Sequence, residues 1–179
     1  MNFYPSKLNL KAPDNVVISL SRLLNNGEYL KTIKYCINLI NKFPKDEQIH
    51  YIIGLAYYFS QDFAKSSYHF KYALKLKPNF YQALNNLGII HNEYAYKNNN
   101  TNLSEIKKSI LYFKSSIKIN SNYAYAYENL ATTYFRIGEH FKAVKAFEKA
   151  SKLKQLTNED AEKFIISQKK EDLIPEAFK

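Results

Sequence analysis

A spacing of 34 residues recurs along this chain and constrains its fold more than any other feature. It separates three pairs of like residues: Pro44 and Pro78, Gly54 and Gly88, and Phe113 and Phe147. From Phe70 to Phe113 the spacing grows to 43 residues, and an Asn-rich stretch at 97–105 supplies the nine extra residues. A fixed period of this length is typical of a repeat array, in which each unit buries its apolar face against its neighbours.

The period divides the chain into four units, at 13–46, 47–80, 81–123 (which carries the inserted loop 97–105) and 124–157. Each unit has the pattern of two amphipathic helices. In the second unit Ile49, Ile53 and Ala56 recur at three- and four-residue steps, as residues on one helical face do. The second helix of that unit is predicted to end before Pro78, because proline lacks an amide hydrogen and restricts the residue before it.

Small residues occupy matching places in the two helices of a unit. In the first helices these residues are Gly54, Gly88 and Ala131, and in the second helices they are Ser66, Ser109 and Ala143. Two helices approach to about 8 Å only where small side chains face each other. We therefore expect close helix pairs, with the large aromatic residues around the contact forming the core.

At these positions the sequence resembles the tetratricopeptide-repeat (TPR) family. The runs that carry the resemblance are Ile53-Gly-Leu-Ala-Tyr57, Asn86-Leu-Gly88, Asn129-Leu-Ala131-Thr-Thr-Tyr134 and Phe147-Glu-Lys-Ala150. The resemblance covers about 145 of the 179 residues, and the unit at 13–46 fits least well, since Leu20 stands where a small residue is expected. It implies an all-α fold, a right-handed α-solenoid of antiparallel helix pairs, and a non-catalytic protein–protein interaction module that acts as an adaptor or scaffold.

The two ends of the chain fall outside the repeat pattern. Residues 1–12 are predicted to form a loosely ordered leader. At 158–179 we expect a capping helix over roughly 158–170, followed by a tail. Asn158 is a favourable N-cap, acidic residues follow it, and Ala161, Phe164 and Ile165 would cover the last repeat.

The sequence holds no arrangement typical of catalysis or of cofactor binding. There is no glycine-rich phosphate loop, His-Glu-x-x-His, Cys-x-x-Cys or Gly-x-Ser-x-Gly motif. The four histidines lie apart in sequence without metal-ligand spacing, and His91 takes a core position where we expect it to be hydrogen-bonded. We expect no enzyme activity, cofactor, metal or small-molecule substrate.

No secretory signal is evident at the start of the sequence, and the longest apolar run, at 52–59, is too short to cross a membrane. The single cysteine, Cys36, cannot form an internal disulfide, and we interpret it as a buried, reduced thiol. These features favour a cytoplasmic location.

The resemblance places the partner-binding groove on the first helix of each unit. The helical register predicts that its main contacts are Tyr51, Leu55, Tyr58, Phe59, Asn85, Asn86, Ile89, Tyr125, Asn129, Phe135 and Arg136, with Val17, Ser21, Leu24 and Asn25 from the first unit. The aromatic residues would anchor the side chains of a peptide or helix of another protein, and Asn86 and Asn129 would bond its backbone. One TPR class binds acidic chaperone C-termini through a clamp that includes lysine and arginine. Whether this clamp is aligned to start at the first unit or at the second, the sequence has no lysine or arginine at its positions, so we do not expect that ligand.

The net charge of +10 leaves an alternative open. Most lysines are predicted to lie on the second helices, on the face opposite the groove. This face could attract nucleic acid or an acidic membrane. A solvated surface explains the same lysines, and we expect neither ligand to be the main partner.

Overall fold

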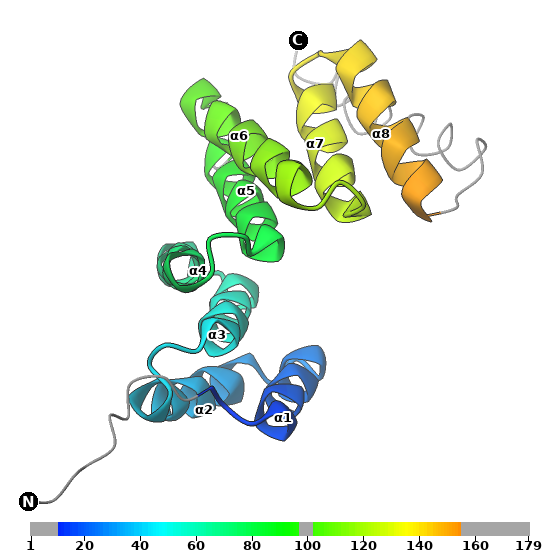
Figure 1. Ribbon diagram of the computed structural model, residues 1–179. Coiled ribbons are helices and arrows are strands. Elements are labelled where there is room, and N and C mark those ends of the chain that lie inside the picture. The colour runs from blue at the N-terminus through cyan, green and yellow to red at the C-terminus, as the bar shows by residue number, and fades with distance from the viewer. Residues whose placement is uncertain (1–10, 97–101, 155–179) are drawn as a thin grey trace, which may run out of the picture. The chain divides into compact units, whose positions relative to one another are not determined.

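The computed structural model describes residues 11–96 and 102–154, and all of the regular secondary structure in these ranges is α-helix (Figure 1). Three predictions fall wholly or mainly outside the described residues: the leader up to residue 10, most of the inserted loop, and the capping helix with the tail.

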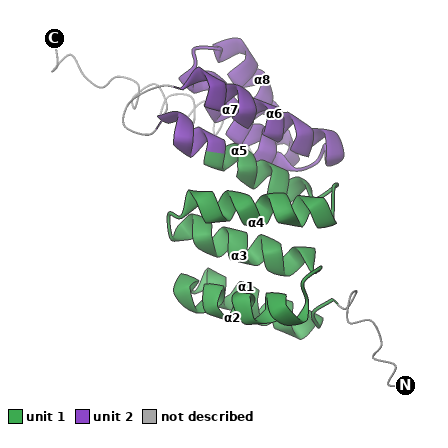
Figure 2. Ribbon diagram, turned by 90° about the vertical axis from the view of Figure 1, so that its left-hand side faces the viewer, with its two compact units in different colours: residues 1–90 green, residues 91–179 purple. Residues whose placement is uncertain are grey.

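The described residues form eight helices in four consecutive pairs. Their bounds are α1 (Asp14–Asn25), α2 (Tyr29–Lys42), α3 (Glu47–Phe59), α4 (Phe63–Leu76), α5 (Tyr81–Tyr96), α6 (Leu103–Ile119), α7 (Ala124–Arg136) and α8 (His140–Lys154). Each of the four ranges drawn from the sequence period contains one pair. The chain also divides into two compact units, residues 1–90 and 91–179, and this division falls inside α5 rather than between two pairs (Figure 2).

In the first compact unit, α3 packs against α4 at the small residues that the sequence singled out. A Cβ atom added to Gly54 would lie 2.7 Å from Cε1 of Phe70, whose side chain is fully buried. The Ser66 hydroxyl donates a hydrogen bond of 2.8 Å to the Gly54 carbonyl. The predicted close approach of these two helices is therefore confirmed, and it needs glycine at position 54.

In the first, second and fourth pairs, the turn between the two helices holds a left-handed residue. Gly27 and Gly138 have φ of 77° and 76°, and Gln61 stands at the equivalent place with φ of 63°. Glycine adopts this conformation freely, whereas a residue with a Cβ atom is strained in it. The second pair therefore holds a strained turn where the first and fourth pairs have relaxed ones.

The end of the predicted leader is fixed rather than loose. Ala12 is only 6% exposed, and its amide donates a hydrogen bond of 2.8 Å to Oδ2 of Asp46. The other oxygen of this carboxylate caps α3 by accepting from the amides of Gln48 and Ile49. Ala12, the last residue of the predicted leader, is thus held in place, because a buried N-cap has a second oxygen to satisfy.

In the second compact unit, much of the nine-residue insertion lengthens helices. The pair α5 and α6 has 16 and 17 residues, whereas α3 and α4 have 13 and 14. Asn102 caps α6 by accepting from the amides of Ser104 and Glu105. The carboxylate of Glu105 binds Lys108 and His91, each at 2.6 Å. Both hydrogen bonds, that of Lys108 foremost, lower the pKa of Glu105.

His91 has the hydrogen-bonded core position that the sequence predicted. Its Nδ1 atom lies 2.6 Å from Oε2 of Glu105, and its ring stacks on Tyr112 with centroids 5.2 Å apart. Next to it, Asn92 accepts from Ser109 at 2.6 Å and donates to Thr133 at 2.7 Å. These contacts satisfy the buried polar groups and join α5, α6 and α7.

Candidate protein-interaction surface

A partly exposed aromatic cluster joins the ends of three helices in the first compact unit. Phe59 ends α3 and stacks on Tyr29 at the start of α2, with ring centroids 5.2 Å apart. Tyr58 meets Phe59 edge to face at 5.5 Å, and Phe63 at the start of α4 at 5.6 Å. Phe59 is still 48% exposed in this setting. We call these four residues the aromatic cluster.

Sequence reasoning found two members of the aromatic cluster and missed the other two. Tyr58 and Phe59 were predicted as groove residues. Tyr29 and Phe63 were not, although they are 34 residues apart and each follows the turn of its pair. That repeat-equivalent pair of aromatic residues was the signal that could have found them.

A shallow groove of about 460 Å³ runs along α1 in the same unit. It is lined by Val17, Ile18, Ser21, Arg22, Asn25 and Asn26. Three of these, Val17, Ser21 and Asn25, were expected to face a partner, whereas Leu24 is buried. The lining residue Asn26 is followed by Gly27, and a Cβ atom added to Gly27 would lie 3.9 Å from the hydroxyl of Tyr29 in the aromatic cluster.

Tyr51 and Asn86, two of the predicted contacts, are engaged with each other. The Asn86 amide donates a hydrogen bond of 3.1 Å to the Tyr51 hydroxyl. The Tyr51 ring packs on Phe80 at 4.8 Å and on Phe70 at 5.7 Å. Burial raises the pKa of Tyr51 to about 12. Tyr51 therefore serves first to hold α3 against its neighbours.

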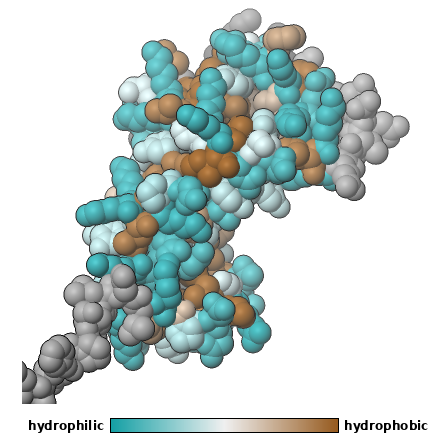
Figure 3. Space-filling view, in the orientation of Figure 1, coloured by the Kyte–Doolittle hydropathy of each residue, from teal (hydrophilic) through white to brown (hydrophobic). Residues whose placement is uncertain are grey.

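The other predicted contacts of this unit differ in exposure. Leu55 and Ile89 are half-buried, so part of each side chain reaches the surface. Asn85 is buried and lies within the helix packing. Figure 3 shows that apolar side chains reach the surface in small areas among hydrophilic ones, as expected for a protein that keeps most apolar groups inside.

In the second compact unit, Tyr125 and Arg136 are the exposed members of the predicted set. The ammonium group of Lys154 lies 4.2 Å from the centroid of the Tyr125 ring, and the Arg136 guanidinium lies 4.7 Å from that of Tyr96. Asn129 is half-buried, and its backbone carbonyl accepts from Thr133 at 2.7 Å. Phe135 is buried, so it supports packing in place of the surface role expected for it.

Two histidines that lie apart in the sequence meet inside the pair of α3 and α4. The Nδ1 atoms of His50 and His69 are 3.2 Å apart, and the rings of Tyr57 and Tyr72 pack against them. Burial lowers the pKa of His50, and burial together with the charge on His50 lowers the pKa of His69 to about 4. Within the described ranges, no three His, Cys, Asp or Glu residues gather as a metal site would require.

None of the helices in the described part of the chain is long and apolar enough to cross a membrane.

Comparison with known proteins supports a TPR-like fold. No family model matches the sequence, and no curated protein matches it either. Solved structures do match. Two crystal structures of MamA, a TPR protein, superpose with TM-scores of 0.66 and 0.63, at 18% and 20% identity. Each alignment covers 79% of this chain, and 78% and 75% of the respective MamA chain.

A MamA double mutant gives a TM-score of 0.63 at 19% identity, over 78% of this chain and 74% of its own. At an identity this low, the match supports the fold alone. The order of paired helices and the small residues at their contacts agree with a TPR-like fold. The chain has a TPR-like fold, an all-α solenoid of helix pairs.

Proposed function

We propose that this chain is a non-catalytic protein–protein interaction module that binds a segment of a partner protein at the aromatic cluster and the adjoining groove along α1. The observation that carries the proposal is the exposure of Phe59, 48% in spite of its stacking on Tyr29. A large, rigid aromatic side chain held partly open at a surface is a typical anchor of an interface. The TPR-like fold supports the same function.

The chemistry of this surface suggests the kind of segment that it would bind. Phe59, Tyr58 and the exposed part of Leu55 would take apolar or aromatic side chains. Asn25, which is exposed on the groove, offers an amide that can both donate to and accept from a peptide backbone. Asn86 already donates to Tyr51, so a peptide contact at Asn86 would compete with that hydrogen bond. A contact at Asn25 would leave it in place.

In the second compact unit, Asn129, Tyr125 and Arg136 remain proposed contacts. Tyr125 is exposed beside a lysine, and Arg136 is exposed above the ring of Tyr96. Both would favour a segment that carries carboxylates next to apolar groups.

The test compares Phe59→Ala with a matched variant of another exposed aromatic residue. Tyr68 on α4 is 60% exposed and lies outside the aromatic cluster, so Tyr68→Ala serves as the control. Partners would be captured from cell extract, identified by mass spectrometry and titrated against purified protein. We expect Phe59→Ala to weaken binding by about 2 kcal/mol, or roughly 30-fold, and Tyr68→Ala to leave it unchanged. If the two variants bound the partner with equal affinity, the aromatic cluster would not be the binding site.

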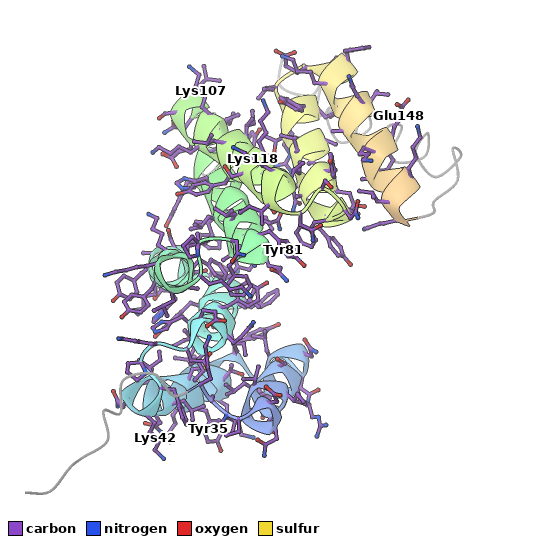
Figure 4. All side chains as sticks on the ribbon, in the orientation of Figure 1. Tyr35, Lys42, Tyr81, Lys107, Lys118 and Glu148 are labelled. Carbon is purple, nitrogen blue, oxygen red and sulfur yellow. The ribbon has the colours of Figure 1, made fainter. Side chains whose placement is uncertain are left out.

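The lysine-rich surface remains the alternative. Lys42 on α2 and Lys107 and Lys118 on α6 project from exposed helix faces (Figure 4). Several other lysines are paired with an acidic residue one turn before them, as Lys31 is with Glu28 at 2.8 Å. Binding of nucleic acid or acidic vesicles by this surface would fall steeply with salt, and a response that does not change with salt would reject it.

A further inference from the structure

Two tyrosines and two lysines share one face of α4 in the first compact unit. Tyr68, Lys71, Tyr72 and Lys75 follow one another at steps of three, one and three residues, which places them side by side on the helix. Tyr68 is 60% exposed, Lys71 and Lys75 are exposed, and Tyr72 is half-buried. We call these four residues the α4 face.

The rings of the α4 face are held in place by the packing beneath them. Tyr72 packs on the buried His50, with ring centroids 4.3 Å apart. Tyr68 meets His69 edge to face at 5.1 Å, and His69 in turn stacks on Tyr57 at 5.6 Å. The planes of Tyr68 and Tyr72 are inclined by 35° at 6.3 Å, so neither neighbour covers Tyr68 by parallel stacking. A planar group could therefore stack on Tyr68 without first ordering the protein.

The α4 face is positively charged. α4 contains three lysines and no acidic residue. Lys65 is neutralised in part by Asp62, which caps the helix and lies 2.7 Å from its ammonium group. Among the residues that the structure describes, no acidic side chain forms an ion pair with Lys71 or Lys75. The ammonium group of Lys75 lies 6.0 Å from the centroid of the Tyr72 ring, so cations and rings belong to one surface.

Rings beside unpaired cations fit a ligand that offers flat groups and negative charges in alternation. A single strand of nucleic acid has this chemistry, because each nucleotide carries a base that can stack and a phosphate that can meet a lysine. A duplex offers the phosphates but keeps the faces of its bases inside the stack. An acidic peptide or an acidic membrane would match the lysines and would leave the open ring of Tyr68 without a flat group to stack on it.

We propose that the α4 face binds single-stranded nucleic acid, with bases stacked on Tyr68 and on the exposed part of Tyr72 and phosphates held by Lys71 and Lys75. None of these residues belongs to the aromatic cluster, so the site is independent of the proposed partner surface. It narrows the lysine-rich alternative to one helix and one class of ligand. Two phosphate contacts on a single strand contribute a slope of about −1.4 to the change of log affinity with log salt.

The experiment titrates the full chain into a labelled oligo(dT) strand of about 12 nucleotides and follows fluorescence anisotropy. An abasic strand with the same phosphates and a duplex of the same length show whether bases are bound. The variants are Tyr68→Ala, Tyr68→Phe, and Lys71→Ala with Lys75→Ala.

Two matched controls change similar residues elsewhere. Tyr35→Ala removes a tyrosine of α2 that is 47% exposed. Lys145→Ala with Lys149→Ala removes two exposed lysines of α8.

We expect wild type to bind oligo(dT) about tenfold more tightly than the abasic strand, because stacking adds to the charge attraction. Tyr68→Ala should remove this preference, and Tyr68→Phe should keep it because the ring remains. Loss of Lys71 and Lys75 should weaken the binding of both strands and make the salt slope less negative by about 1.4. Both controls should bind as wild type does.

Several results would overturn the proposal. Bases are not bound if wild type binds oligo(dT), the abasic strand and the duplex equally, or if Tyr68→Ala and Tyr35→Ala behave alike. If the two lysine variants lose the same affinity, the charge of the whole chain attracts the strand in place of the α4 face. If vesicles that contain phosphatidylserine depend on Tyr68 and oligo(dT) does not, the face binds a membrane.

Discussion

The contact between His50 and His69 makes the stability of the first compact unit depend on pH. Nε2 of His50 lies 3.3 Å from the Pro44 carbonyl, which can only accept, so His50 carries its proton on Nε2. Its Nδ1 is then the acceptor for Nδ1–H of His69 at 3.2 Å. Protonation of His50 would place two N–H groups against each other. The folded protein therefore resists the uptake of protons here.

The magnitude follows from the pKa of His69, which falls from 6.5 to about 4 in the folded protein. A lowered histidine pKa gives stability that is complete above pH 6.5 and is lost as the pH falls towards 4. Between pH 7 and pH 5 this amounts to about 2 kcal/mol without screening. The His69 ring is partly exposed, so we expect about 1 kcal/mol.

The assay is urea unfolding at pH 7 and pH 5 at constant ionic strength. His69→Phe keeps a ring between Tyr57 and Tyr68 but cannot be protonated. The fall in unfolding free energy from pH 7 to pH 5 should be about 1 kcal/mol smaller in this variant than in wild type. Tyr68→Phe, the control, changes the neighbouring side chain and should keep the wild-type pH dependence. An equal pH dependence in wild type and His69→Phe would refute the reasoning.

Three further predictions concern packing, the strained turn and the thiol. Gln61→Gly should raise the unfolding free energy by about 0.5–1 kcal/mol in chemical denaturation because it relieves a left-handed residue, whereas Gly138→Gln should lower it by about 1 kcal/mol. Gly54→Ala should lower it by about 1–3 kcal/mol, since the new methyl group meets Phe70, and a neutral result would contradict the close contact. Burial raises the pKa of Cys36 to about 12, so a thiol reagent should label the native protein slowly and the denatured protein at once.

Much of the fold follows from the sequence because repeat spacing and helical periodicity are local properties. The close contact at Gly54 and the core position of His91 were each predicted from one position and its equivalents. The hydrogen bond of Ala12 was not predicted, because its partner, Asp46, lies 34 residues away. A hydrogen bond over that distance leaves no mark in the local pattern.

The candidate site could be predicted only in outline. Periodicity predicts which helix face a residue occupies, but it does not predict which side chains of a neighbouring helix will contact that residue. Tyr51 was therefore expected at the surface, whereas Phe80 and Asn86 engage it. The approach of His50 and His69 was missed for the same reason, because they come from different helices and meet only when these pack.

The central claim is that the aromatic cluster receives a segment of another protein, and site-specific photo-crosslinking tests it most directly. A photoreactive phenylalanine analogue would replace Phe59 in one protein and Tyr68 in another, and each would be irradiated in cell extract. We predict one dominant crosslinked protein from position 59, identified by mass spectrometry, and no enrichment of it from position 68. The same proteins captured equally from both positions would contradict the account.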